Sequence, residues 1–211
     1  MITFSNLIKK NHKSANFYIN DCTQRPLEHN YWFVKKPLMF LPIQKNASSS
    51  VKFLLGQKFN IRDEYKDKPF WFTVIRDPLE RFKSTVKMTN GPLALDQIKW
   101  YLTTHDKNWV SNAPDWLLSM LGHFLPQKSH ISHWQTEQDV KFFSIHKLHI
   151  LERHLKEYSK DPVHIPIFNK SLGESRQSSK EIDKWMSDNM DWISEFISID
   201  TKWLTQLDFE K

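Results

Sequence analysis

The chain has 211 residues, of which 39% are hydrophobic and 14% aromatic, and these totals predict one ordinary folded domain and exclude a disordered chain. Its net charge of +6 favours anionic partners, but Lys and Arg are interspersed with carboxylates, which argues against a nucleic-acid-binding arm. Cys22 is the only cysteine, so neither an intrachain disulfide nor a multi-cysteine zinc site can form.

Residues 1–36 are polar with scattered aromatics, and we expect an irregular N-terminal arm there. The apolar run 38–43 predicts a strand that is buried on both faces. A polar loop follows it, residues 51–56 predict a helix of about two turns, and the apolar run 70–75 predicts a second strand. Strand, helix and strand form a βαβ unit, which implies parallel strands and a right-handed crossover.

A second helix begins directly after residue 75. Asp77 is a good N-cap, Pro78 suits the first helical position, and Glu80 completes a capping box. We expect this helix to end near Thr89, before a Gly-Pro pair at 91–92.

The second half of the chain gives weaker signals. Residues 93–135 are expected to be mostly helical and loop-like, and 147–151 are a candidate third strand. From Ser178, capped by Glu181, an apolar stripe predicts a C-terminal helix over 178–207. The predicted fold class is α/β, with residues 1–211 as a single domain whose central parallel sheet is flanked by helices.

Polar segments follow both predicted strands, at the point where each strand ends and a helix begins. Ligands of open α/β sheets bind beyond the carboxyl ends of the strands, and a helix N-terminus suits a phosphate or sulfate. The first segment adds Lys45 and three serine hydroxyls, although ordinary helix capping explains the same composition. A Walker A pattern is absent, which argues against a P-loop kinase or ATPase.

In the second segment Arg76 stands at the strand end, and Ser84 lies two helical turns beyond Asp77. The arginine fork and the serine hydroxyl are good phosphate donors. The alternative is a capping network in which Arg76 and Arg81 pair with Asp77 and Glu80.

At these residues the sequence resembles a known family. Residues 42–50, Pro-Ile-Gln-Lys-Asn-Ala-Ser-Ser-Ser, resemble the 5′-phosphosulfate loop of sulfotransferases that use PAPS (3′-phosphoadenosine 5′-phosphosulfate). Residues 71–84 resemble the family's 3′-phosphate motif, Arg-Asp/Asn-Pro-x-Glu-Arg-x-x-Ser. The version and spacing of both motifs are most similar to the carbohydrate sulfotransferase branch.

The resemblance implies the P-loop-like sulfotransferase fold, with a PAPS-binding core at 38–90 and an acceptor-side region at 91–177. The activity it implies is transfer of a sulfuryl group from PAPS to a hydroxyl or amine of a carbohydrate acceptor, with release of PAP and no requirement for a metal. The residues implied to hold the 5′-phosphosulfate are Lys45, Asn46, Ala47, Ser48, Ser49 and Ser50.

By the same resemblance, Arg76 and Ser84 hold the 3′-phosphate. Lys45 would also neutralise the charge that builds on the leaving phosphate oxygen. Gln44 replaces the proline that usually precedes the lysine, and Ala47 stands where glycine is common.

The general base is a choice among several residues. His123 is the first choice, because the segment 122–127 resembles the branch's His-aromatic-x-Pro-Gln motif; His105 and Glu80 are the reserves. Residues 147–152 resemble the strand that follows, with its acidic end, and 193–204 resemble the closing helix. Four tryptophans either line an acceptor groove or pack in the core, namely Trp100, Trp109, Trp116 and Trp134.

Two functions other than an enzyme are compatible with a basic chain that carries these motifs. A nucleotide- or polyanion-binding module without catalytic activity would keep the same donor-site residues, whereas a nucleic-acid binder would need a basic stripe that this sequence lacks. No apolar run reaches about 18 residues, and we expect a cytoplasmic protein with no membrane span or signal peptide, in a bacterial or viral setting. No pattern in the sequence indicates the identity of the acceptor or the oligomeric state.

Overall fold

A computed structural model describes residues 33–35, 37–56, 60–104, 113–128, 130–131, 139–166 and 177–210. The chain divides into two compact units. The sheet unit comprises residues 25–76, 130–169 and 204–211, and the helical unit comprises 1–24, 77–129 and 170–203. The single-domain assignment stays a prediction.

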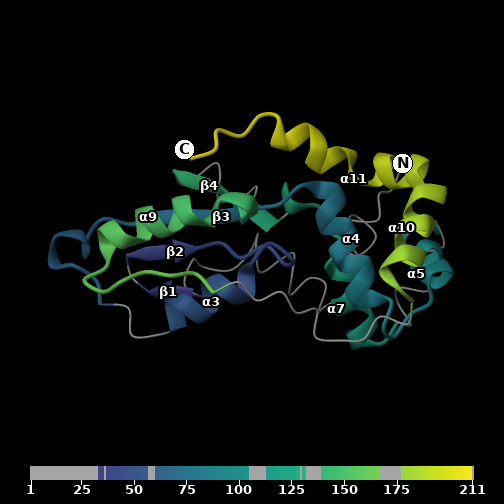
Figure 1. Cartoon of the computed structure of the whole chain (residues 1–211), viewed down its shortest axis with the longest axis horizontal. Helices are drawn as coiled ribbons and strands as arrows, with labels where there is room; N and C mark the ends of the chain where they lie inside the picture. Colours follow the sequence, from purple (N-terminus) through teal and green to yellow (C-terminus); the bar gives the residue numbers. More distant parts are fainter. Residues whose placement is uncertain are drawn as a thin grey trace. The chain divides into compact units, whose positions relative to one another are not determined.

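The sheet unit is built on four strands in the order β1-β2-β3-β4 (Figure 1). Strands β2, β3 and β4 run parallel, and β1 is antiparallel to β2 at one edge. The predicted α/β class, with parallel strands flanked by helices, is confirmed. The four strands are β1 (Phe33–Lys35), β2 (Leu38–Phe40), β3 (Phe70–Ile75) and β4 (Val140–Ser144).

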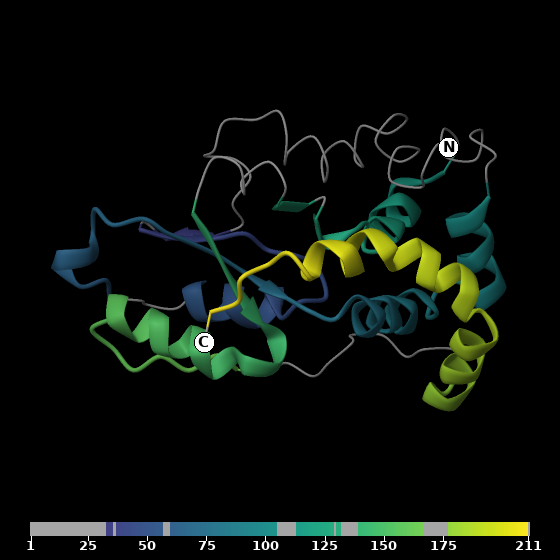
Figure 2. The ribbon, with the colours of Figure 1, turned by 90° about the horizontal axis from the view of Figure 1, so that it is seen from above.

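The central strand β3 has the predicted bounds, and all six of its residues are buried. Its alternate residues Phe70, Phe72 and Val74 belong to one apolar cluster with helices α3 (Ser48–Gly56) and α9 (Leu148–Tyr158). Figure 2 shows α3 and α9 on the same side of the strands. A continuous apolar run is what a strand needs when neither of its faces meets water.

Two predictions for this unit are wrong. The third parallel strand lies at 140–144, and residues 148–158, which include most of the predicted strand 147–151, form helix α9. In α9 the buried side chains of Leu151 and Leu155 are four residues apart, which is helical spacing. Residues 33–35, expected within an irregular arm, form strand β1.

The helical unit follows the predicted capping signals. Asp77 Oδ1 accepts from the backbone N–H of Glu80 at 2.9 Å, and Pro78 opens α4. Ser178 and Glu181 form the predicted capping box at the start of α10. The helices of this unit are α4 (Pro78–Thr89), α5 (Leu95–Thr103), α7 (Asp115–Gly122), α10 (Ser179–Asp188) and α11 (Met190–Leu204).

The C-terminal helix predicted over 178–207 is broken in two at Asn189. The Nδ2 group of Asn189 donates to the carbonyl of Trp185 at 2.8 Å. Its Oδ1 atom accepts from Trp192 Nε1 at 3.0 Å and from Lys99 Nζ at 2.6 Å. A short amide side chain that binds nearby backbone competes with helical hydrogen bonds, so the helix stops there and restarts.

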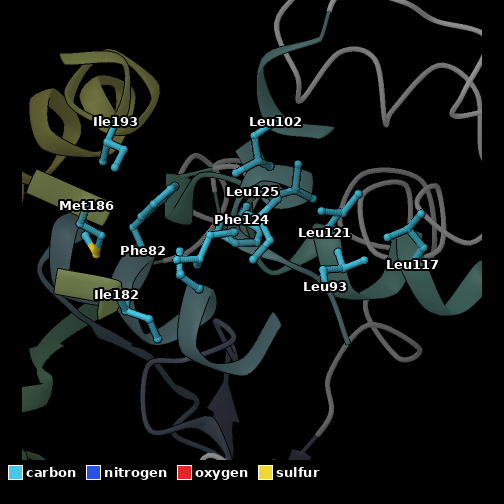
Figure 3. Close-up of a cluster of buried hydrophobic side chains, with 13 residues drawn as sticks. Phe82, Leu93, Leu102, Leu117, Leu121, Phe124, Leu125, Ile182, Met186 and Ile193 are labelled. Carbon is cyan, nitrogen blue, oxygen red and sulfur yellow. The ribbon is translucent and has the colours of Figure 1, made fainter. Parts of the chain in front are cut away.

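The apolar core of the helical unit extends from α10 and α11, past Phe82 of α4 and Phe124, to α7 (Figure 3). The Phe82 ring makes edge contacts with Phe124, Trp192 and Phe196 at centroid distances of 5.2, 5.9 and 5.8 Å. These contacts join α4 to the segment after α7 and to α11.

Across the part of the chain that the structure describes, no helix has the length and apolar character needed to cross a bilayer.

Candidate functional site

The loop between β2 and α3 passes from strand to helix through a strained turn. The backbone N–H of Asn46 donates to the carbonyl of Ile43 at 3.2 Å and closes the turn. Lys45 has φ 68° and Ala47 has φ 57°, both in the left-handed region. Because a Cβ atom makes this region costly, by about 1–2 kcal/mol per residue, surrounding contacts have to hold the loop. The positive φ of Ala47 also explains why glycine suits this position.

Buried hydrogen bonds to β3 provide that support. Asn46 is fully buried, and its Nδ2 group donates to the carbonyl of Val74 at 3.0 Å. Thr73 Oγ1 donates to the carbonyl of Leu41 at 2.7 Å. Since β2 ends at Phe40 while β3 continues, the Asn46 side chain satisfies a β3 carbonyl that a longer β2 would have reached.

Arg76 comes directly after β3 and reaches the same loop. Its Nη1 group donates to the carbonyl of Lys45 at 3.4 Å, and both residues are half-buried. The structure therefore brings Lys45 and Arg76 together beyond the carboxyl ends of two neighbouring parallel strands. This edge is where open α/β sheets bind their ligands.

Helix α3 begins at this edge with the serine row. The Ala47 carbonyl accepts from the N–H of Val51 at 3.1 Å, which sets the first helical turn. The first N–H groups of an α-helix have no acceptor within the helix, and in α3 those groups include the ones of Ser48 and Ser49. Ser48 is half-buried and Ser49 exposed, whereas Ser50 is only 4% exposed. An anion at the helix start would therefore meet Ser48 and Ser49 first.

Lys52 adds a third cation, which the sequence analysis did not single out. It lies four residues after Ser48, one helical turn away on the same face of α3. The residue is half-buried, and burial lowers the pKa of its ammonium group. The four-residue spacing from a loop serine was the available sequence signal.

Two other predicted site residues, Ser84 and His123, belong to the helical unit. Ser84 is half-buried on α4, three residues after Arg81. The Arg81 Nη2 group donates to the carbonyl of His123 at 2.8 Å, at the end of α7. The guanidinium of Arg81 thus binds the segment after α7.

The remaining candidates for acid–base chemistry and for an acceptor surface differ in exposure. Glu80 is exposed in the first turn of α4. Trp100 and Trp116 are 49% and 52% exposed, so these two do not pack in the core. The other predicted residues of this kind lie outside the described residues, namely His105, Trp109 and Trp134.

Comparisons of the chain with protein-family models, curated proteins and solved structures found no match. Among the described residues, no group of three or more His, Cys, Asp or Glu side chains is placed to hold a metal ion.

Proposed function

We propose that the chain is a PAPS-dependent sulfotransferase of the P-loop-like sulfotransferase fold, with a carbohydrate as its acceptor class. The observation that carries the proposal is the loop at the start of α3. There a left-handed Lys45 and a left-handed Ala47 are held by hydrogen bonds from Asn46 and Arg76. Left-handed turns at a helix start form concavities of backbone N–H groups that bind anions. Lys45 and Arg76 add two positive charges there, which complement the negative charge of a phosphosulfate.

In the proposed reaction the acceptor oxygen or nitrogen attacks sulfur in line. The bond between sulfur and the bridging phosphate oxygen breaks, its electron pair stays on the 5′-phosphate of PAP, and the acceptor proton goes to a base. Lys45 neutralises the charge that develops on the leaving oxygen. Arg76 and Ser84 hold the 3′-phosphate, and His123 is the proposed base.

Calorimetric titration with PAP tests the donor site. Lys45→Ala should weaken PAP binding by about tenfold or more, because a hydrogen bond to a charged group contributes about 1.5–3 kcal/mol. Lys156→Ala is the matched control, since Lys156 is exposed on α9 of the same unit. Wild-type protein that binds no PAP at high micromolar concentration refutes the donor site.

A transfer assay with sulfur-labelled PAPS then separates an enzyme from a binding module. The acceptors to screen are carbohydrates, phenols and amines, and we expect sulfation of a carbohydrate. If PAP binds but no acceptor is sulfated, the chain is the inactive nucleotide- or polyanion-binding module. If Lys45→Ala transfers sulfate at the wild-type rate, the role assigned to Lys45 is wrong.

A further inference from the structure

Two buried residues of opposite charge lie within the helical unit. Arg81 on α4 and Asp200 on α11 are each 4% exposed. Both line a small recess that has room for about one water molecule, so the recess is not a substrate pocket. Arginine and aspartate are almost never this buried unless they are paired, and the charge of Arg81 acts on the Asp200 carboxyl.

The pair holds both ends of the segment that follows α7. At its start, Arg81 Nη2 donates to the His123 carbonyl at 2.8 Å. At its end, Asp200 Oδ2 accepts from the backbone N–H of Gln127 at 2.8 Å, and Oδ1 accepts from that of Lys128 at 3.1 Å. Each of these bonds involves a charged group and is about twice as strong as a neutral one. The backbone of residues 123–128 is therefore fixed from two helices.

The same pair fixes this segment relative to the helix that carries Ser84. Arg81 and Ser84 are three residues apart on α4, so their side chains are neighbours on the helix surface. Phe82 of α4 also packs on Phe124 of the segment at a centroid distance of 5.2 Å. Ser84, the proposed ligand of the donor, and His123, the proposed base, thus lie on two elements that Arg81 and Asp200 both help to support.

Stability alone is a poor reason for such a pair. Replacing buried charged groups with well-packed apolar residues is often neutral or stabilising, whereas in some proteins buried charges specify one geometry of their hydrogen-bonded partners. A recess bordered by Phe82, Phe124 and Phe196 is a place where apolar replacements could pack.

We propose that Arg81 and Asp200 are positioning residues, which set the backbone of the His123–Lys128 segment against α4 for the acceptor step. The inference rests on the proposed function, because it takes His123 as the base and Ser84 as a donor ligand. Lys45 and Arg76, in contrast, are supported by the loop after β2 and do not depend on this pair.

The test compares wild type with Asp200→Asn and Arg81→Lys in three measurements: amide hydrogen exchange, PAP affinity, and kcat with KM. We expect faster exchange in residues 123–128 of both variants. A small misplacement of a catalytic group can cost about 100-fold, and we expect a kcat loss approaching that size with little change in KM. PAP affinity should change far less than kcat, because Lys45 and Arg76 keep their own supports in the loop after β2.

The matched control is Asp183→Asn, which makes the same chemical change at a half-exposed partner of Lys83 and should alter none of the three measurements. Arg81→Lys keeps a positive charge near Asp200, so it serves if Asp200→Asn does not fold. The positioning role is overturned if hydrogen exchange in residues 123–128 of the variants is unchanged, or if exchange is faster but kcat is unchanged. In either case the proposed function still stands, provided that the wild-type protein binds PAP and transfers sulfate. Wild-type protein that neither binds PAP nor transfers sulfate refutes the function, and this role with it.

Discussion

Replacing Asn46 by alanine removes the side chain that ties the strained loop to β3. The hydrogen bond from Nδ2 to the Val74 carbonyl is 3.0 Å long and buried, so the replacement removes this donor from a buried carbonyl. An unsatisfied buried group costs about 1–3 kcal/mol. Asn46→Asp keeps the shape but has no N–H donor and sets a negative charge beside the carbonyl oxygen. We expect the free energy of unfolding to fall in the order wild type, Asn46→Ala, Asn46→Asp.

The Asn46→Ala replacement should also weaken the binding of PAP. Lys45 and Ala47 flank Asn46 with φ values of 68° and 57°, and each conformation costs about 1–2 kcal/mol. Without the tie to β3 the loop can relax, and apparent affinity falls by the fraction of molecules that keep the binding conformation. A change of about 2 kcal/mol in that equilibrium sets an upper limit of about 30-fold on the loss of PAP affinity.

Urea unfolding gives the stabilities and calorimetry gives the PAP affinities. Asn60→Ala is the control, because the Asn60 side chain makes an exposed hydrogen bond to Asp161 in the same unit. Its effect should stay below about 0.5 kcal/mol. Asn46→Ala with the stability of the control, or Asn46→Asp more stable than Asn46→Ala, would refute the hydrogen bond as the anchor. A large loss of stability with unchanged PAP affinity would refute its link to the site.

Two further predictions concern the backbone of the loop and the buried carboxyl. Ala47→Val should be less stable than Ala47→Gly by about 1–3 kcal/mol in urea unfolding, because a β-branched residue is poorly tolerated at positive φ; equal stabilities would contradict the left-handed conformation. Burial raises the pKa of Asp200, and the charge of Arg81 and the N–H groups of Gln127 and Lys128 offset this only in part. The folded state therefore binds the proton more tightly than the unfolded state, and the stability of wild type relative to Asp200→Asn should rise as pH falls from about 7 to about 4. A difference that is constant or shrinks over that range would contradict the raised pKa.

The elements that could be predicted from the sequence are those with strong local signals. Asp77 and Ser178 bind the N–H groups of residues three positions later, so their capping can be predicted from the local sequence. Strand β3 is a continuous apolar run, which predicted its bounds. The run 147–151 was too short to separate strand from helix, and only the amphipathic spacing over the whole of α9 decides it.

The candidate site divides in the same way. The polar loop at 44–50 and Arg76 could be found because each follows an apolar strand, and the parallel pairing of β2 and β3 brings them together. The left-handed conformation of Lys45 was not foreseen, since it depends on supports from β3. No sequence signal indicated that Ser50 is buried, in contrast to Ser48 and Ser49 before it.

Local patterns in the sequence are enough to predict the α/β class, the central strand, the helix starts and the position of the loop between Gln44 and Ser50. These features follow from residues within one or two turns of each other, where capping and apolar periodicity act. The hydrogen bond from Asn46 to β3, and those from Arg81 and Asp200 to the His123–Lys128 segment, join residues far apart in the sequence and could not be predicted from it. Such contacts form when distant segments are packed together and water is excluded, because a buried polar group then has to find its partner within the fold.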